Sequence, residues 1–128
     1  MAGEASMTVT CHCKTITVTV PNKPEFVNEC QCTICRSYRA GWAYYTVEGV
    51  SIPKLKDLKS YARKDVGKAN HIFRFCPECY CLVCWWPTNA SDPKGEVGIN
   101  TTFWDPKDLE YVERRISWED LQDNSRTG

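Results

Sequence analysis

The feature that most constrains this chain is the grouping of its nine cysteines. Nine is an odd number, and no charged segment followed by an apolar core begins the chain, so we expect neither a secretory signal nor a disulfide framework. Cysteines one or two residues apart bridge one another poorly, but their thiolates converge easily on one metal ion, and a reducing compartment favours that outcome. The groups are Cys11 and Cys13; Cys30, Cys32 and Cys35; and Cys76, Cys79, Cys81 and Cys84.

Length and charge set the broad class. We expect residues 1–128 to form a single domain, with residues 1–6 and 122–128 as flexible tails. The 16 basic and 16 acidic residues balance, which gives no basic surface for nucleic acid or an anionic membrane. No apolar run approaches the roughly 18 residues that span a bilayer. The expectation is a cytoplasmic protein without a nucleic-acid or membrane partner, and the oligomeric state stays open.

Short strands separated by turn residues predict a mainly β, zinc-stapled sheet assembly with few or no helices. Trp85 and Trp86 are adjacent on one expected strand, so one should face inward and the other outward. Residues 54–68 fit either a helix or a Lys-rich solvent-facing loop. The expected strands cover residues 16–20, 41–47, 50–52, 72–75, 82–86, 97–103 and 111–116.

Seven of the cysteines divide into two candidate metal sites. Cys11 and Cys13, with the Cys76 and Cys79 knuckle, could close a four-thiolate site, which has no open position and is therefore structural. The middle group offers three thiolates on one short loop, which leaves a fourth position for water or substrate. One alternative is that another cysteine completes this second site. Free core cysteines and iron–sulfur ligation are further alternatives, and nothing in the sequence selects the latter. The middle group is Cys30, Cys32 and Cys35.

The order of these motifs resembles the glutathione-dependent formaldehyde-activating enzyme family, whose domain also occurs in centromere protein V. The most specific part is residues 30–36 (CQCTICR) with Gly41 following, and the second is residues 75–79 (FCPEC). The resemblance implies two zinc ions per chain on a β-sheet scaffold. It implies a structural zinc on Cys11, Cys13, Cys76 and Cys79, and a catalytic zinc on Cys30, Cys32 and Cys35.

The activity implied by the resemblance is carbon–sulfur chemistry on a glutathione adduct such as S-hydroxymethylglutathione. Donation from three thiolates makes zinc a mild Lewis acid, suited to holding a thiolate or alkoxide. We therefore expect a zinc-dependent carbon–sulfur or carbon–oxygen lyase acting on a thiol adduct or related small electrophile, for which a specialised biosynthetic pathway is one setting. The alternative is a non-catalytic zinc-stabilised binding module, which the balanced charge disfavours for anionic polymer partners.

Several side chains near these motifs are candidates for the chemistry. Arg36 could bind a substrate carboxylate through two hydrogen bonds, or could simply lie on the surface. His71 is the main candidate acid or base at neutral pH, although a lone histidine is more often structural. The aromatic residues of 42–45 could line a pocket, although core packing is favoured. Cys81 and Cys84 are most simply small buried apolar side chains.

Three positions depart from the usual family pattern. Family members usually carry glycine after the Cys-x-Cys motif and after the Phe-Cys-x-x-Cys knuckle, where this chain has Lys14 and Tyr80. Glycine there would serve a positive φ or a close backbone approach, so the sequence predicts a different local turn. Gln31 replaces a histidine often found in the second motif. These differences leave the thiol and electrophile partners open.

Overall fold

The computed structural model describes residues 5–64 and 70–118, and strands dominate them. The mainly β prediction is confirmed, with one six-residue helix in the described part. The expected tails lie largely outside the described residues. The elements are β1 (Met7–Thr10), β2 (Thr17–Val20), β3 (Phe26–Cys30), α1 (Thr33–Tyr38), β4 (Trp42–Thr46), β5 (Lys59–Ala62), β6 (His71–Phe75), β7 (Leu82–Pro87), β8 (Glu96–Asn100) and β9 (Glu113–Ser117), with 3-10 turns at Val47–Gly49, Leu55–Asp57 and Pro106–Leu109.

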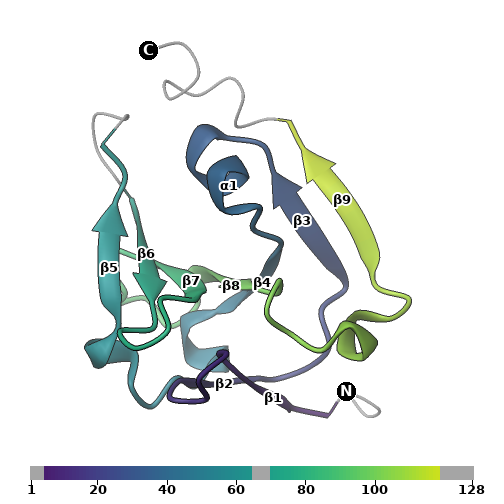
Figure 1. The fold of residues 1–128 in the computed structure, drawn as a ribbon, viewed down its shortest axis with the longest axis horizontal. Coiled ribbons are helices and arrows are strands. Elements are labelled where there is room, and N and C mark those ends of the chain that lie inside the picture. Colours follow the sequence, from purple (N-terminus) through teal and green to yellow (C-terminus); the bar gives the residue numbers. More distant parts are fainter. Residues whose placement is uncertain (1–4, 65–69, 119–128) are drawn as a thin grey trace.

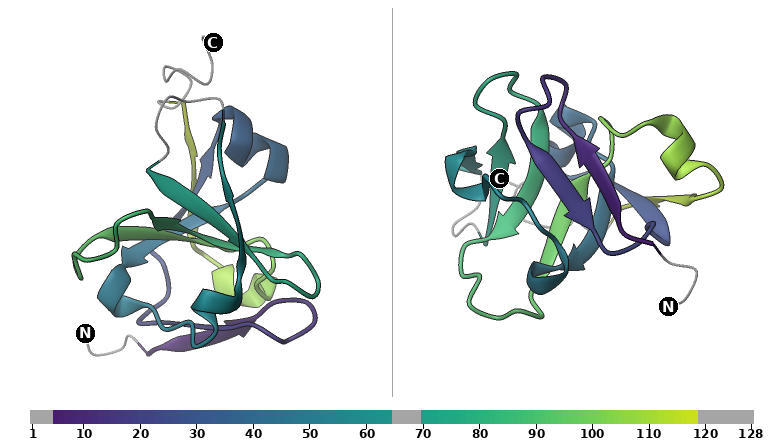
Figure 2. Two further views of the ribbon diagram at one scale, coloured as in Figure 1. Left: turned by 90° about the vertical axis from the view of Figure 1, so that its left-hand side faces the viewer. Right: turned by 90° about the horizontal axis from the view of Figure 1, so that it is seen from below.

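Seven strands form one sheet in the order β5-β6-β7-β8-β4-β3-β9, and β1 pairs with β2 in a separate hairpin. Neighbouring strands are antiparallel except β3 and β9, which are parallel. The sheet is strongly bent, so that α1 lies between a wing of β5 and β6 and a wing of β3 and β9 (Figure 1). The β1–β2 hairpin crosses the opposite side (Figure 2).

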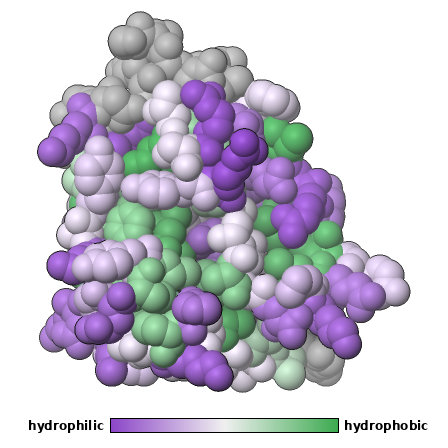
Figure 3. Space-filling model, viewed as in Figure 1, coloured by the Kyte–Doolittle hydropathy of each residue, from purple (hydrophilic) through white to green (hydrophobic). Residues whose placement is uncertain are grey.

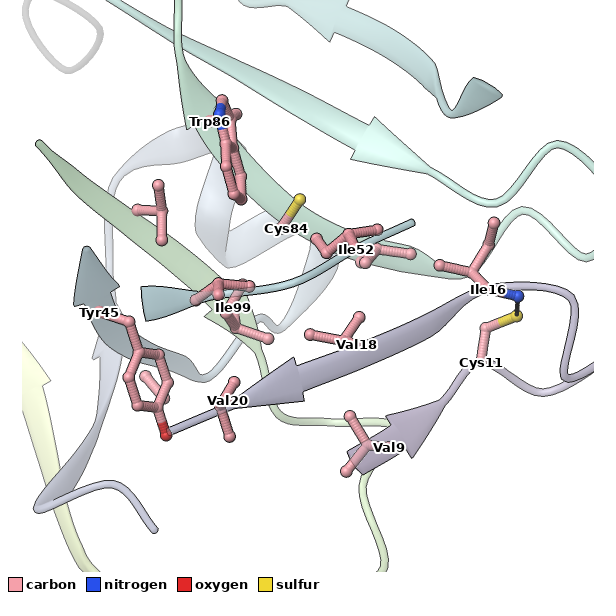
Figure 4. Packing of buried hydrophobic residues seen from close by; sticks show 14 of the residues in the cluster. Val9, Cys11, Ile16, Val18, Val20, Tyr45, Ile52, Cys84, Trp86 and Ile99 are labelled. Atoms are coloured by element: carbon pink, nitrogen blue, oxygen red, sulfur yellow. Dashed lines mark hydrogen bonds between the residues drawn. The ribbon is translucent and has the colours of Figure 1, made fainter. Parts of the chain in front are cut away.

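The two faces of the sheet carry different residues because side chains alternate along each strand. On β4, Ala43 and Tyr45 pack with Val18 and other residues of the β1–β2 hairpin, and this forms the main core (Figure 4). Trp42 and Tyr44 belong to the other face, with the middle cysteines. A bent sheet therefore separates an apolar core from a face that carries reactive side chains.

Trp85 and Trp86 follow the same alternation, as predicted, but neither is exposed. Trp86 packs in the main core, while Trp85 is buried on the face of the middle cysteines. Trp85 lies flat over its cross-strand partner, since a Cβ built at Gly98 would be 2.1 Å from its indole nitrogen. Gly98 therefore makes room for this ring.

Some expected elements are wrong in detail. Residues 50–52 do not form a strand, and Ser51 makes an isolated bridge to Thr19. Residues 65–68 of the segment 54–68 lie outside the described part. Residues 54–64 form neither one helix nor only a loop, because they contain a 3-10 turn and β5, whose side chains are all exposed at the sheet edge. β8 ends at Asn100, before the predicted end at 103. β1 and β3 were not predicted, because polar residues interrupt their apolar pattern.

A further difference concerns the middle cysteines, which do not share a loop. Cys30 ends β3, Cys32 is the N-cap residue of α1, and Cys35 lies within α1. A strand and a helix therefore position these sulfurs more rigidly than a loop would.

No membrane-spanning helix is found in the described part of the chain, because none of its helices has the length and hydrophobicity that a span requires.

Candidate metal centres

Two hairpin turns bring the first cluster together. Cys11 and Cys13 lie in the turn between β1 and β2, and Cys76 and Cys79 lie in the turn between β6 and β7. Their four sulfurs all lie within 4.8 Å of one another. The sulfur of Cys13 is 3.7 Å from that of Cys11 and 3.6 Å from that of Cys76. Four sulfurs placed tetrahedrally about 2.3 Å from one zinc would be roughly 3.8 Å apart, so this cluster fits zinc.

The two turns have matching hydrogen bonds. Cys11 N donates to Ile16 O at 3.1 Å, and Cys76 N donates to Cys81 O at 3.0 Å, five residues on in each case. Inside each turn, the residue after the second cysteine donates its N–H to the first cysteine's carbonyl at 2.9 Å. These residues, Lys14 and Tyr80, have φ of 68° and 61°. The predicted different turn is therefore wrong: the non-glycine residues adopt the left-handed conformation that glycine would serve.

Backbone N–H groups surround the sulfurs of this first cluster. Ile16 N donates to Cys11 Sγ at 3.4 Å, and Glu78 N donates to Cys76 Sγ at 3.3 Å. Hydrogen bonding to Thr15 lowers the pKa of the Cys13 thiol to about 6, while burial raises that of Cys11 to about 12. Donors aimed at sulfur favour the thiolate, which is the form that binds metal.

The second cluster consists of Cys30, Cys32 and Cys35, whose sulfurs also lie within 4.8 Å of one another. All three are buried, at 4%, 2% and 7% exposure. Within residues 5–64 and 70–118, no further histidine, cysteine or carboxylate joins this group. Cys81 packs against the main core and Cys84 is fully buried in it, so neither completes the triad. The triad could therefore hold a metal ion through three sulfur ligands, one fewer than a saturated tetrahedral site.

Side chains, rather than backbone groups alone, donate to the sulfurs of the triad. Trp42 Nε1 donates to Cys35 Sγ at 3.3 Å, and Arg63 Nη1 approaches Cys32 Sγ at 3.8 Å. Hydrogen bonds from Cys30 and Cys35 hold the pKa of the Cys32 thiol far below its ordinary value, and the charge of Arg63 acts in the same direction. Such neighbours orient the ligands and tune a bound metal.

Aromatic side chains cover the sheet face next to the triad. Tyr44 Oη accepts a hydrogen bond from Asn28 Nδ2 at 2.6 Å. Burial raises the pKa of Tyr44 to about 12, and Cys30 and Cys35 add to the effect, so the hydroxyl is protonated at neutral pH. The ring centroids of Tyr44 and Trp85 lie 6.4 Å apart. A hydroxyl and an indole thus accompany the thiolates on one face.

The structure also places the other sequence candidates. His71 is exposed at the start of β6 and stacks on Trp85 with ring centroids 4.0 Å apart. Arg36 Nη1 donates to Gln31 O at 3.1 Å, within the segment that carries the triad. Their roles as acid or base and as carboxylate-binding group stay predictions. The sequence analysis did not identify Arg63 or Asn28, because neither lies in a cysteine motif and their contacts with Cys32 and Tyr44 join segments far apart in the chain.

A bent, mainly β sheet with one four-cysteine and one three-cysteine cluster defines the class: a small thiolate-rich β protein suited to binding metal. The family profile described as glutathione-dependent formaldehyde-activating enzyme matches residues 6–117, and the chain belongs to this family. No curated protein matches the chain.

A crystal structure of a Rhodobacter sphaeroides protein is similar to this chain, with a TM-score of 0.63 and 24% sequence identity. The similarity covers 84% of this chain and 99% of that one. At this identity the likeness establishes a shared fold.

Proposed function

We propose that the chain is a zinc-dependent lyase that makes or breaks a carbon–sulfur or carbon–oxygen bond on glutathione, another thiol adduct or a related small electrophile. In this proposal Cys11, Cys13, Cys76 and Cys79 hold a structural zinc, and Cys30, Cys32 and Cys35 hold a catalytic one. The observation that carries the proposal is the difference between the clusters: four cysteines saturate a tetrahedral ion, whereas three leave one position open.

The reaction we assign is the addition of a thiol to an aldehyde, and its reverse. The carbon–sulfur bond forms as the carbonyl π bond breaks. The thiol loses its proton and the carbonyl oxygen gains one, so there is no net oxidation or reduction. Zinc at the triad would stabilise the anion of a substrate thiol or hydroxyl.

Side chains of the protein orient the sulfurs of the triad and donate a hydrogen bond to the substrate oxygen. Trp42 and Arg63 orient the sulfurs of Cys35 and Cys32 through their N–H donors. Asn28 donates to Tyr44 Oη, which leaves the tyrosine hydrogen for an acceptor on the substrate. A neutral Tyr44 therefore supports the developing alkoxide, and Tyr44→Phe should lower the rate without removing metal.

The proposal is tested by mixing zinc-loaded protein with glutathione and formaldehyde and following adduct exchange by NMR. We expect faster exchange with the wild-type chain and loss of that enhancement in Cys32→Ser. Absence of enhancement with fully loaded protein rules out this substrate pair. If two zinc ions are bound, both with four protein sulfurs and no exchangeable ligand, the lyase proposal fails and a zinc-stabilised binding module replaces it.

A further inference from the structure

One edge of the seven-stranded sheet is formed by β9, and in the described part of the chain no strand pairs with its outer side. The strand pairs regularly with β3 over five residues and contains neither a proline nor a bulge. Prolines, bulges and like charges are the devices that usually protect such an edge from another chain. Figure 1 shows β9 at the right-hand margin of the molecule, and Figure 3, drawn from the same side, shows hydrophobic side chains beside hydrophilic ones along that margin.

Large apolar side chains gather at this edge. Six large hydrophobic residues are exposed in residues 5–64 and 70–118, and three of them lie in β9 or beside its ends. Tyr111 is 95% exposed, Ile116 52% and Trp118 59%. Scattered apolar residues on a surface need no explanation, but a group of them beside a free strand edge indicates a surface for protein–protein contact.

The two edges of the sheet differ in charge. At the other edge, Lys59 lies in β5, and Arg63 and Lys64 follow that strand. Two copies joined through β5 would oppose cations with cations, which is destabilising. β9 instead carries both signs on one face, because Glu113 and Arg115 are two residues apart and their side chains are in contact at 2.9 Å. Charge therefore disfavours a second copy at β5 and allows one at β9.

Antiparallel pairing of β9 with β9 of a second copy has one register that matches these charges. Gln31 N donates to Ser117 O in the β3–β9 ladder, so alternate residues direct their backbone groups toward β3 and Arg114 directs its groups outward. A two-fold axis at Arg114 therefore pairs outward groups with outward groups. It places Glu113 opposite Arg115 of the partner subunit, in a non-hydrogen-bonded pair, where side chains approach most closely.

The other pairs of this register are also compatible. Arg114 meets Arg114 of the partner subunit, but each has its own Glu29 carboxylate at 3.2 Å, which offsets the repulsion. Ile116 lies opposite Val112 of the partner subunit, and the two-fold axis repeats this apolar contact. Pairing thus covers exposed apolar side chains and satisfies the free backbone groups of the strand.

We propose that two copies of this chain associate through antiparallel pairing of their β9 strands about a two-fold axis at Arg114. The two sheets then form one continuous sheet. The arrangement closes on itself, because each copy uses its β9 edge once and the cationic β5 edges remain at the outer ends. The inference is independent of the proposed reaction, since it uses no residue of either cysteine cluster.

Analytical ultracentrifugation of the zinc-loaded chain tests the inference. We expect wild type to reach twice the mass of one chain as the concentration rises. Glu113→Arg and Arg115→Glu each place like charges opposite one another at two symmetry-related positions. Each should therefore raise the dissociation constant of the dimer by on the order of ten-fold or more.

The double variant Glu113→Arg/Arg115→Glu exchanges the two charges and restores both cross-strand pairs. We expect it to dimerise with a dissociation constant within a few-fold of the wild-type value, and an equimolar mixture of the two single variants to form a heterodimer. Lys59→Glu is the matched control, because it reverses an exposed charge on the other sheet edge and should leave the dissociation constant unchanged.

A wild-type chain that stays monomeric at every concentration would overturn the inference. Single variants that dimerise as tightly as wild type would also overturn it, because association would then use another surface. A double variant as weak as the single variants would refute the register at Arg114. Circular dichroism of each variant is compared with wild type, so that loss of the dimer is separated from loss of the fold, and either single variant is sufficient if the other misfolds.

Discussion

Lys14 and Tyr80 hold left-handed backbone conformations directly after a cysteine of the four-cysteine cluster, at φ of 68° and 61°. For residues with a Cβ this conformation costs roughly 1–2 kcal/mol. Both turns nevertheless keep the N–H bond to the first cysteine's carbonyl, at 2.9 Å. These hydrogen bonds offset part of the cost, and the strain that remains is one that a glycine would remove.

Replacing Tyr80 by glycine should therefore stabilise the protein. Tyr80 is 63% exposed, so its ring contributes little packing, and the left-handed turn no longer opposes a Cβ. We expect the free energy of unfolding of Tyr80→Gly, measured by denaturant titration at equal zinc loading, to exceed that of Tyr80→Ala by about 0.5–1 kcal/mol. Tyr80→Ala keeps the strain and removes the ring, so equal stability of the two variants would contradict this account of the turn.

The elements show what a sequence alone can predict. Strands with strong alternation, such as β2, and those bounded by the cysteine knuckles, such as β6 and β7, were located within a residue or two. The grouping of the seven clustered cysteines into sets of four and three was also correct as a spatial grouping. Local periodicity and short motif spacing carried that information.

The rest depended on contacts between distant segments. β5 has no buried side chain, and it is a strand because β6 offers its edge. Arg63 follows this strand and reaches Cys32, 31 residues earlier, through the bend of the sheet. No local pattern encodes such an approach, so the contact of Arg63 with the triad could not be predicted.

The two clusters should differ in what their loss does to the elements. The four-cysteine cluster links two hairpins whose cysteines are 63 residues apart, between Cys13 and Cys76. Structural zinc contributes apparent binding free energy on the order of 10 kcal/mol in small domains. We expect Cys76→Ser to be insoluble or unfolded by circular dichroism.

Cys32→Ser and Cys35→Ser should keep the β-type circular dichroism spectrum and lose up to one zinc ion, because the triad spans only adjacent elements.

Cys81→Ser is the control for this comparison. Cys81 adjoins the first cluster but lies outside its four sulfurs, so this variant should keep the wild-type fold and zinc content. A folded Cys76→Ser with full metal content, or unfolding of both triad variants, would show that the structural and local roles are assigned to the wrong clusters.

At the scale of the whole molecule, one bent sheet serves two purposes. Its outer face packs against the β1–β2 hairpin through apolar side chains (Figure 4). The four-cysteine cluster brings together the turn of that hairpin and the turn between β6 and β7. Its inner face holds the triad, Trp42 and Tyr44 beside α1. Under the proposed function, stability and chemistry would lie on opposite faces, so that a site with an open position on the inner face would not weaken the core.

The central claim is that one cluster is closed and the other has an open position. It is tested most directly by cadmium-113 NMR of the cadmium-substituted protein, which gives a separate signal for each site. We predict two signals, of which only one shifts when one equivalent of glutathione is added, and that signal should be missing from Cys32→Ser. Two signals that both stay unchanged with glutathione, each showing four protein sulfurs, would contradict the claim.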